Sequence, residues 1–240
     1  MGVVVHEARK IYHTWGRFVR ALDGLNLDAE TGQVTLIVGT NGSGKSTLLR
    51  AISGSLRLDS GDVLIDGSYR PSIGRKEVGM LQQVPVANLC PSFTIEEMIR
   101  LYLDGHSVDS WKGARTAFQD HGMAVNSRIR EMSGGQQQLI ALELVLARLP
   151  SILLLDEPTA SLDPGHSERI LARVAKAASE GVTVLLVSHN LEHGLSICDK
   201  VVLMHEGRVV NSWAGSIARS LTARDLKQCL VECAASSLEG

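Results

Sequence analysis

The sequence is poor in aromatic side chains and in long hydrophobic segments, and each shortage excludes a class of protein. Phe, Trp and Tyr together make up 4% of the 240 residues, too few for the stacked aromatic platforms that bind single-stranded nucleic acid. No apolar run approaches the ~20 residues that a membrane-spanning helix needs, and no signal peptide is visible. If the protein acts at a membrane, we expect another chain to provide the part that crosses it.

A large excess of charge is absent as well, and cysteines are few. The formal net charge of −2 at pH 7 argues against general electrostatic binding to nucleic acid or to anionic lipid. The four cysteines are scattered except for Cys229 and Cys233, and no nearby histidine or third cysteine completes a metal site. We therefore expect reduced thiols, as in a cytosolic protein. The composition, 44% hydrophobic and 21% charged, is that of a globular protein with a sizeable core.

What the sequence does contain is a glycine-rich loop between an apolar run, residues 34–38, and a second apolar stretch. Glycines let the backbone curl so that several N–H groups point at one anion, and the start of the following helix adds its positive end. Lys45 can reach the β- and γ-phosphates of a nucleotide, and the Ser46 hydroxyl is placed to hold Mg²⁺. The pattern predicts a phosphate-binding loop rather than an ordinary turn. Its residues are Gly39, Thr40, Asn41, Gly42, Ser43, Gly44, Lys45, Ser46 and Thr47.

Two carboxylates, Asp156 and Glu157, follow a buried strand predicted for residues 152–155. Such a strand places its terminal charges at the carboxyl edge of a sheet, where α/β folds bind ligands. Successive side chains of a strand point to opposite sides, so the two acids can have different tasks. Asp156 is suited to hold Mg²⁺, and Glu157 is then free to orient and polarise an attacking water. The alternative is that Glu157 is only a solvated acid, and its position after this strand and this aspartate argues against that.

Three further candidates carry weaker signals. Residues 133–136 form a glycine-paired turn into a helix N-terminus, which could bind a second anion or could simply be a capped helix. His189 follows an apolar strand and could reach a γ-phosphate from the same sheet edge, although a histidine there is usually structural. Gln83 follows a strand, so it could link metal coordination to movement of the segment after it.

The order of the expected elements indicates an α/β fold. Apolar strands alternate with helices, which predicts a mainly parallel sheet covered by helices, preceded by an N-terminal antiparallel β part. We expect an aromatic-rich loop over residues 11–18. Thr94 and Glu97 predict a capping box, and residues 88–134 are expected to form a small helical subdomain, leaving 1–87 and 135–240 as a nucleotide-binding core. The other expected elements are helices at 132–149, 167–179, 191–197 and 222–234, strands at 63–65, 78–81, 152–155 and 182–187, and a hairpin at 201–210.

Taken together, these motifs resemble the ATP-binding subunit of an ABC (ATP-binding cassette) transporter, and the likeness covers roughly residues 3–228. Any one motif could arise by chance, whereas six in this order are very specific. They are the phosphate loop, Gln83, Met132 to Gln136, residues 153–157, Ser161 to Asp163, and Ser188 with His189.

The resemblance implies ATP and Mg²⁺ as ligands, with a P-loop NTPase core, and a role for each matching residue. Tyr12 matches the aromatic residue that stacks on adenine. Gln83 matches the lid glutamine near Mg²⁺ and the attacking water, with Gln82 a weaker candidate for that place. Asp163 matches the loop that couples two sites across a dimer, and His189 matches the switch histidine. The remaining assignments are the signature, Ser133, Gly134, Gly135 and Gln136; the catalytic group, Glu157, His189, Gln83 and Lys45; and the metal ligands, Ser46, Gln83 and Asp156.

The resemblance also implies a dimer, because the family closes each site with the phosphate loop of one chain and the signature of another. Two ATP molecules would then join two cassettes, and hydrolysis would loosen the contact and drive a membrane partner. The chain departs from the family pattern at Thr40 in place of proline, at Met132 in place of leucine, and at Gln137, where Arg or Lys is common. The last change removes a positive charge near the signature, which bears on the strength of ATP-driven closure.

Which system the protein serves depends on finer likenesses. Residues 83–97, 188–193 and 203–208 resemble bacterial amino-acid-type uptake cassettes, which implies a separate permease, a solute-binding protein and a place on the cytoplasmic face of the membrane. Export or lipoprotein extraction stays open as an alternative. A soluble ABC ATPase acting on DNA or ribosomes usually has two cassettes or long coiled-coil insertions, and this chain has neither. A nucleotide-sensing module without turnover is a further alternative, against which Glu157 argues.

Overall fold

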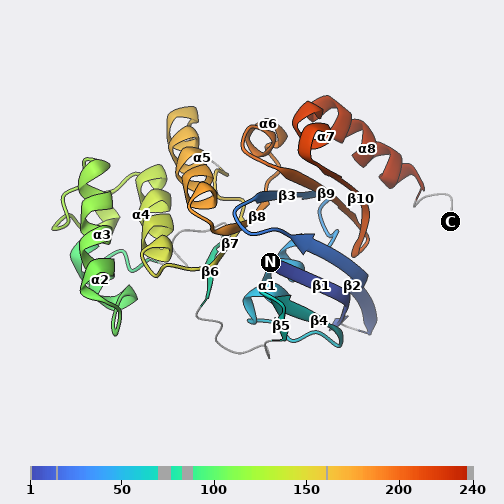
Figure 1. The fold of residues 1–240 in the computed structure, drawn as a ribbon, viewed down its shortest axis with the longest axis horizontal. Coiled ribbons are helices and arrows are strands. Elements are labelled where there is room, and N and C mark those ends of the chain that lie inside the picture. The colour runs from blue at the N-terminus through green and yellow to red at the C-terminus, as the bar shows by residue number, and fades with distance from the viewer. Residues whose placement is uncertain (1, 15, 70–76, 83–88, 161, 237–240) are drawn as a thin grey trace.

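The computed structural model describes residues 2–14, 16–69, 77–82, 89–160 and 162–236. Two sheets and a set of helices make up the molecule (Figure 1). The first sheet is antiparallel with strand order β2-β1-β4-β5. Its strands are β1 (Val3–Thr14), β2 (Arg17–Ala29), β4 (Ser60–Ile65) and β5 (Ser68–Tyr69).

The second sheet has six strands in the order β10-β9-β3-β8-β7-β6, and all but the edge strand β10 run parallel. This confirms the expected α/β class with a mainly parallel sheet and an N-terminal antiparallel part. The strands are β3 (Val34–Gly39), β6 (Val78–Leu81), β7 (Ile152–Asp156), β8 (Thr183–Val187), β9 (Lys200–His205) and β10 (Arg208–Ala214).

The core lies on both faces of the six-stranded sheet, because alternate strand residues point to opposite sides. On β7, Leu153 and Leu155 belong to one buried cluster, whereas Ile152 and Leu154 belong to the other. Helices cover the first face, and α1 with the antiparallel sheet covers the second. The helices are α1 (Lys45–Ser53), α2 (Ile95–Tyr102), α3 (Val108–Asp120), α4 (Gly134–Leu146), α5 (Pro164–Ser179), α6 (Leu191–Leu195), α7 (Gly215–Ser220) and α8 (Ala223–Ser236), with a short 3₁₀ helix at Ile129–Glu131.

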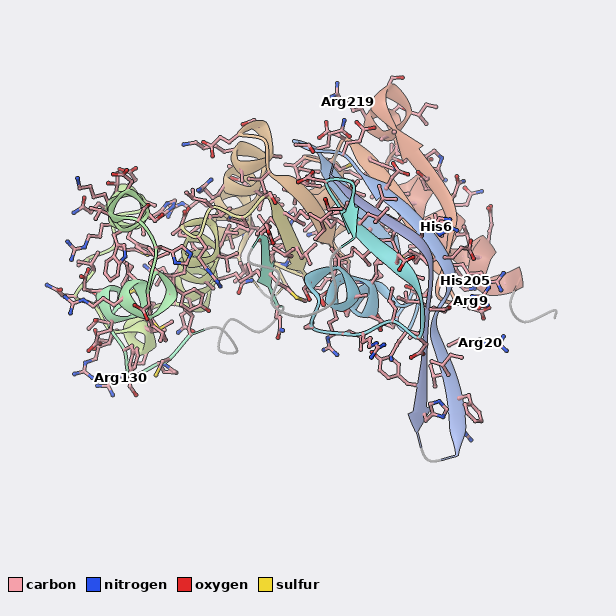
Figure 2. All side chains as sticks on the ribbon, turned by 60° about the horizontal axis from the view of Figure 1, so that its bottom comes forward. His6, Arg9, Arg20, Arg130, His205 and Arg219 are labelled. Atoms are coloured by element: carbon pink, nitrogen blue, oxygen red, sulfur yellow. The ribbon has the colours of Figure 1, made fainter. Side chains whose placement is uncertain are left out.

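The aromatic-rich loop expected over residues 11–18 is wrong. Residues 11–14 belong to β1 and residues 17–18 to β2, and the two strands form one long hairpin in which Tyr12 pairs with Val19 and His13 with Phe18. The physical reason is that β-branched and aromatic residues favour pleated strands, where they pack across the pair. The hairpin extends beyond the body of the molecule, with Arg20 on β2 pointing away from it (Figure 2).

The boundaries of the helices that the sequence predicts individually differ from the observed ones by up to three residues. Thr94 and Glu97 form the predicted capping box at the start of α2. In α4 the helix ends at Leu146, three residues earlier than expected, because the residue before a proline avoids the helical conformation and Leu149 adopts φ +55°. The start of α5 lies earlier than expected, at Pro164, with Asp163 as its N-cap.

The helices α2 and α3 both pack against α4, and α4 in turn packs against α5 and β6. The division of the chain at residues 88 and 134 stays a prediction. None of the helices in the described part of the chain combines the length and the apolar character needed to cross a bilayer.

Candidate active site

Three neighbouring parallel strands bring the phosphate loop, Asp156, Glu157 and His189 to one edge of the sheet. The central strand of the three is β8, which pairs with β3 on one side and β7 on the other. Each ends at this edge, β3 at Gly39, β7 at Asp156 and β8 at Val187. A cleft of about 630 Å³ opens there. Its lining residues are Tyr12, Val19, Ala21, Asn41, Gly42, Gly44, Lys45, Ser46, Thr47, Asp156, Glu157, Val187 and His189.

The glycine-rich loop depends on glycine for both its conformation and its close packing. Gly42 and Gly44 have φ values of +83° and +101°, in the left-handed region that favours glycine. A Cβ atom on Gly44 would lie 2.2 Å from the Ala21 carbonyl oxygen, and one on Gly39 would lie 2.3 Å from that of Met204. Helix α1 follows with no side-chain hydrogen bond at its N-cap, so its first N–H groups remain available to an anion. This backbone fits a phosphate group.

Lys45, the first residue of α1, turns back over the loop. Its Nζ donates to the carbonyl oxygens of Gly39 (2.7 Å) and Thr40 (2.9 Å) and lies 3.4 Å from Ser43 Oγ. The residue is 7% exposed. Burial lowers the pKa of Lys45, and the carboxylates of Glu157 and Asp156 oppose this shift. A buried ammonium whose acceptors are two carbonyl oxygens and a hydroxyl is placed to gain from a phosphate oxygen.

Glu157 is held in an uncommon backbone conformation, with φ +54°. Its N–H donates to the Val187 carbonyl at 3.0 Å, and its Oε2 accepts from the backbone N–H of His189 at 3.0 Å. Its Oε1 lies 3.5 Å from His189 Nε2 and has no hydrogen-bond partner among the residues that the structure describes. Burial raises the pKa of Glu157, and the hydrogen bond from His189 opposes the rise. A buried acceptor without a partner, lining the cleft, fits the binding of a water molecule.

Two oxygen ligands suited to Mg²⁺, Ser46 and Asp156, line the same cleft. A hydroxyl and a carboxylate fit this ion, which prefers oxygen ligands and takes the rest of its shell from water and phosphate. The third predicted ligand, Gln83, and Ser161 of the fifth motif lie outside the described residues.

Tyr12 lines the cleft, but from a strand rather than from a loop. Its cross-strand partner Val19 and the nearby Ala21 line the cleft too, and sequence reasoning missed both. The signal that could have found them is the alternation of residues along β2, because residues 19 and 21 share one face of the strand.

The predicted signature lies apart from this cleft. Ser133 caps α4, with its Oγ accepting from Gln136 N (3.2 Å) and its own N–H donating to Gln136 Oε1 (2.9 Å). Asp163 caps α5 by accepting from His166 N (3.1 Å). Neither residues 133–136 nor Asp163 belong to the lining of the cleft. The structure therefore brings together the phosphate loop, Tyr12, both carboxylates and His189, and leaves the signature and Asp163 elsewhere on the same chain.

Gln137, at a position where Arg or Lys is common in the family, hydrogen-bonds to the residues before the signature turn. Its Nε2 donates to the carbonyl oxygens of Met132 (3.0 Å) and Ile129 (3.3 Å). The neutral amide thus satisfies two carbonyls at the start of α4.

Comparison with known proteins gives matches among the ATP-binding proteins of ABC transporters. The family model described as "ABC transporter" matches residues 22–160. The tyrosine transport ATP-binding protein of Clostridioides difficile is 31% identical over 221 residues, 85% of this chain and 88% of that protein. The methionine import ATP-binding protein MetN 1 of Listeria monocytogenes is 34% identical over 224 residues, 87% of this chain and 65% of that protein.

Solved structures extend the likeness to the fold. A dimeric post-hydrolysis state of the ATP-binding cassette MJ0796, bound to ADP and Pi, superposes with a TM-score of 0.78 at 28% identity, covering 88% of this chain and 98% of that one. The cbiO1 protein of Clostridium perfringens, part of the ABC transporter complex cbiONQ, superposes with a TM-score of 0.78 at 26% identity, covering 95% and 92%. The family match spans more than half of the chain and the relatives cover most of it, so the protein belongs to the ABC transporter family as an ATP-binding subunit, an ATPase that uses Mg²⁺.

Proposed function

We propose that two copies of this cassette close on ATP and, by hydrolysing it, drive a separate membrane permease that imports a small polar solute such as an amino acid. The observation that carries the proposal is the separation of the two halves of the site. The phosphate loop, Asp156 and Glu157 line one cleft, whereas Ser133 to Gln136 lie outside it. A second chain that contributes its own signature would complete each cleft.

Within the cleft, the phosphate loop and the start of α1 bind the phosphates. Lys45 exchanges the carbonyls of Gly39 and Thr40, which now hold its ammonium, for phosphate oxygens, whose negative charge stabilises the ammonium more strongly than neutral carbonyl oxygens do. Ser46 and Asp156 would hold Mg²⁺, which neutralises charge on the β- and γ-phosphates when bound. Tyr12 stacks on the adenine base from its strand.

Glu157 and His189 position the attacking water. The Glu157 oxygen without a partner, Oε1, accepts a hydrogen bond from the water and takes its proton as the water oxygen attacks the γ-phosphorus and the bond to ADP breaks. Burial makes this carboxylate a better base, since it raises the pKa of Glu157. The backbone N–H of His189 fixes the other oxygen, and its side chain, 56% exposed, faces the γ-phosphate. Gln83 would help to hold Mg²⁺ and the attacking water.

The import assignment rests on the relatives. Their names give transport of tyrosine, of methionine and, for GluA of Corynebacterium efficiens, of glutamate; GluA is 33% identical over 207 residues, 80% of this chain and 83% of that protein. The cassette would then sit on the cytoplasmic face of the membrane through its permease, with a solute-binding protein delivering the solute. Export or lipoprotein extraction is the alternative.

ATP-dependent uptake of labelled tyrosine, methionine or glutamate into vesicles containing the adjacently encoded permease tests the import assignment. A lack of uptake of all three amino acids would count against it.

The ATPase cycle itself is tested with Glu157→Gln, which keeps the size of the side chain and removes the base. ATP should still bind, steady-state hydrolysis should fall at least ~100-fold, and an ATP-bound dimer should accumulate, as measured by light scattering after size exclusion. Glu168→Gln, an exposed carboxylate on α5, is the matched control and should behave as wild type. Wild-type turnover in Glu157→Gln would refute the proposed role of Glu157.

A further inference from the structure

The starts of α4 and α5 meet at one side chain, His166. Gly135 is the second residue of α4, and a Cβ atom built on it would lie 2.5 Å from both Cγ and Cδ2 of His166 and 2.9 Å from its Cβ. The imidazole ring therefore packs directly on the backbone of the signature turn. Gly134, one residue earlier, has open space around it, so the close approach is specific to Gly135.

The same ring also contacts Asp163. Both carboxylate oxygens of Asp163 interact with His166, Oδ1 with the backbone N–H at 3.1 Å and Oδ2 with Nδ1 at 2.6 Å. These hydrogen bonds lower the pKa of Asp163, so it is a carboxylate at neutral pH and accepts from a protonated Nδ1. The Asp163 side chain is 62% exposed whereas that of His166 is 28% exposed, so the ring fixes an acid that would otherwise rotate in solvent.

The backbone of the signature turn stays available to a ligand in this arrangement. Ser133 engages the N–H groups of Gln136 and Gln137 through its Oγ and carbonyl oxygen. The N–H groups of Gly134 and Gly135 have no acceptor within the described part of the chain, as expected for the first turn of a helix. Further along, Arg173 on α5 donates to the buried Glu143 on α4 at 2.7 Å, so the two helices are joined at a second point.

We propose that His166 is a positioning residue that couples Asp163 to the signature turn within one chain. The signature turn, which is expected to reach the nucleotide of a partner chain, and Asp163, which is expected to couple the two sites of a dimer, then move as one unit, because Gly135 packs on the ring and Asp163 accepts a hydrogen bond from its Nδ1. The inference rests on the proposed closure of two chains on ATP. It assigns a function to a residue outside the six motifs.

The experiment is carried out in the Glu157→Gln protein, whose ATP-bound dimer can be measured at equilibrium. His166→Leu fills the space but removes the Nδ1 donor, and should raise the dimer dissociation constant about tenfold, the effect of losing one hydrogen bond to a carboxylate. His166→Asn places an amide N–H near the position of Nδ1 and should restore most of the affinity, whereas His166→Gln places its amide one bond further out and should not. Glu168→Gln is again the matched control.

Two further readouts separate positioning from folding. Affinity for a fluorescent ATP analogue in the dilute monomer and the midpoint of thermal unfolding should be unchanged in His166→Asn and His166→Gln, so that these two differ only in dimerisation. Dimerisation of His166→Leu within twofold of the parent protein, or equal dimerisation of His166→Asn and His166→Gln, would overturn the inference. A parent protein that stays monomeric with ATP would instead overturn the proposed function, and the inference with it.

Discussion

Tyr12 and Val19 face each other across the β1–β2 hairpin, and both line the cleft. The base of the nucleotide would therefore meet a rigid pair of strand residues rather than a loop. Because paired strands lose little further conformational freedom on binding, the aromatic ring is already in place when ATP arrives.

Replacing Tyr12 tests this contact. Tyr12→Ala should weaken ATP binding about tenfold, since stacking of a base on an aromatic side chain is worth ~1–3 kcal/mol, and Tyr12→Phe should bind as wild type because the ring face remains. Isothermal titration calorimetry measures both. Phe18→Ala is the control, since Phe18 lies on the same hairpin, is 73% exposed and does not line the cleft. Equal affinities for Tyr12→Ala and Phe18→Ala would contradict the contact.

At this scale the sequence predicts which residues line the cleft better than it predicts how they are held. Lys45 belongs to a glycine-rich loop, and Asp156 and Glu157 follow an apolar strand. Both the loop and the strand have local sequence patterns that predict them. The hydrogen bond from the backbone N–H of His189 to Glu157 has no local sequence pattern, because it joins the ends of two strands that are distant in sequence. The place of Val19 depends on its pairing with Tyr12 across the hairpin, and the sequence pattern of residues 11–18 predicts a loop instead of that pairing.

One buried carboxylate, that of Glu143, connects helices α3, α4 and α5. Glu143 on α4 is 2% exposed, and its Oε1 accepts from Arg173 Nε on α5 at 2.7 Å and lies 3.1 Å from His121 Nε2 at the end of α3. A charge with so little solvent requires its partners, since an unpaired buried charge costs several kcal/mol.

Breaking the pair should therefore destabilise the protein strongly. Arg173→Met should lower the free energy of unfolding by ~3 kcal/mol, because it leaves Glu143 buried without its cation, and adding Glu143→Leu should recover most of this loss. Urea denaturation measures both. Lys176→Met removes an exposed cation from the same helix, whose 3.9 Å pair with Glu180 is at the surface, and should change stability by less than ~0.5 kcal/mol. If Arg173→Met costs no more than Lys176→Met, the pair does not hold these helices together.

The sequence shows where most of the elements begin but not how they are joined. The capping box of α2 is a local signal with a direct physical cause, and so is the proline after Asp163, although the start expected for α5, residue 167, does not make use of it. The pair of Glu143 with Arg173 spans thirty residues, and no periodicity indicates it. No sequence pattern predicts the packing of the His166 ring on Gly135 either. A glycine indicates that the backbone needs freedom or space, but it does not show which side chain packs against it.

For the molecule as a whole, the parallel sheet brings motifs that are far apart in the chain together around one cleft. Gly39, Asp156 and Val187 end adjacent strands, so their order along the sequence is enough to predict a common edge. The separation of the signature from that cleft has no equivalent in the sequence, because a linear pattern shows the presence of two halves and not whether they face each other.

Because the cleft gathers groups from three strands, ATP should stabilise the whole fold. At one hundred times its dissociation constant, a ligand that binds only the folded state adds ~2.7 kcal/mol, which corresponds to a rise in melting temperature of ~5–10 °C for a chain of this size. Mg²⁺-ATP should produce this rise in the wild-type protein, and chelation of Mg²⁺ should reduce it. Lys45→Ala should abolish it at the same ATP concentration, since the loop loses its cation.

The matched control for that measurement is Lys112→Ala, an exposed lysine on α3, which should keep the full shift. Lys45→Ala need not melt earlier than wild type without nucleotide, because burial already disfavours the charged form of Lys45 and lowers its pKa. The difference between the two melting temperatures, with and without ATP, therefore isolates binding from folding. A Lys45→Ala protein with the wild-type shift would mean that the phosphate loop does not hold ATP through this lysine.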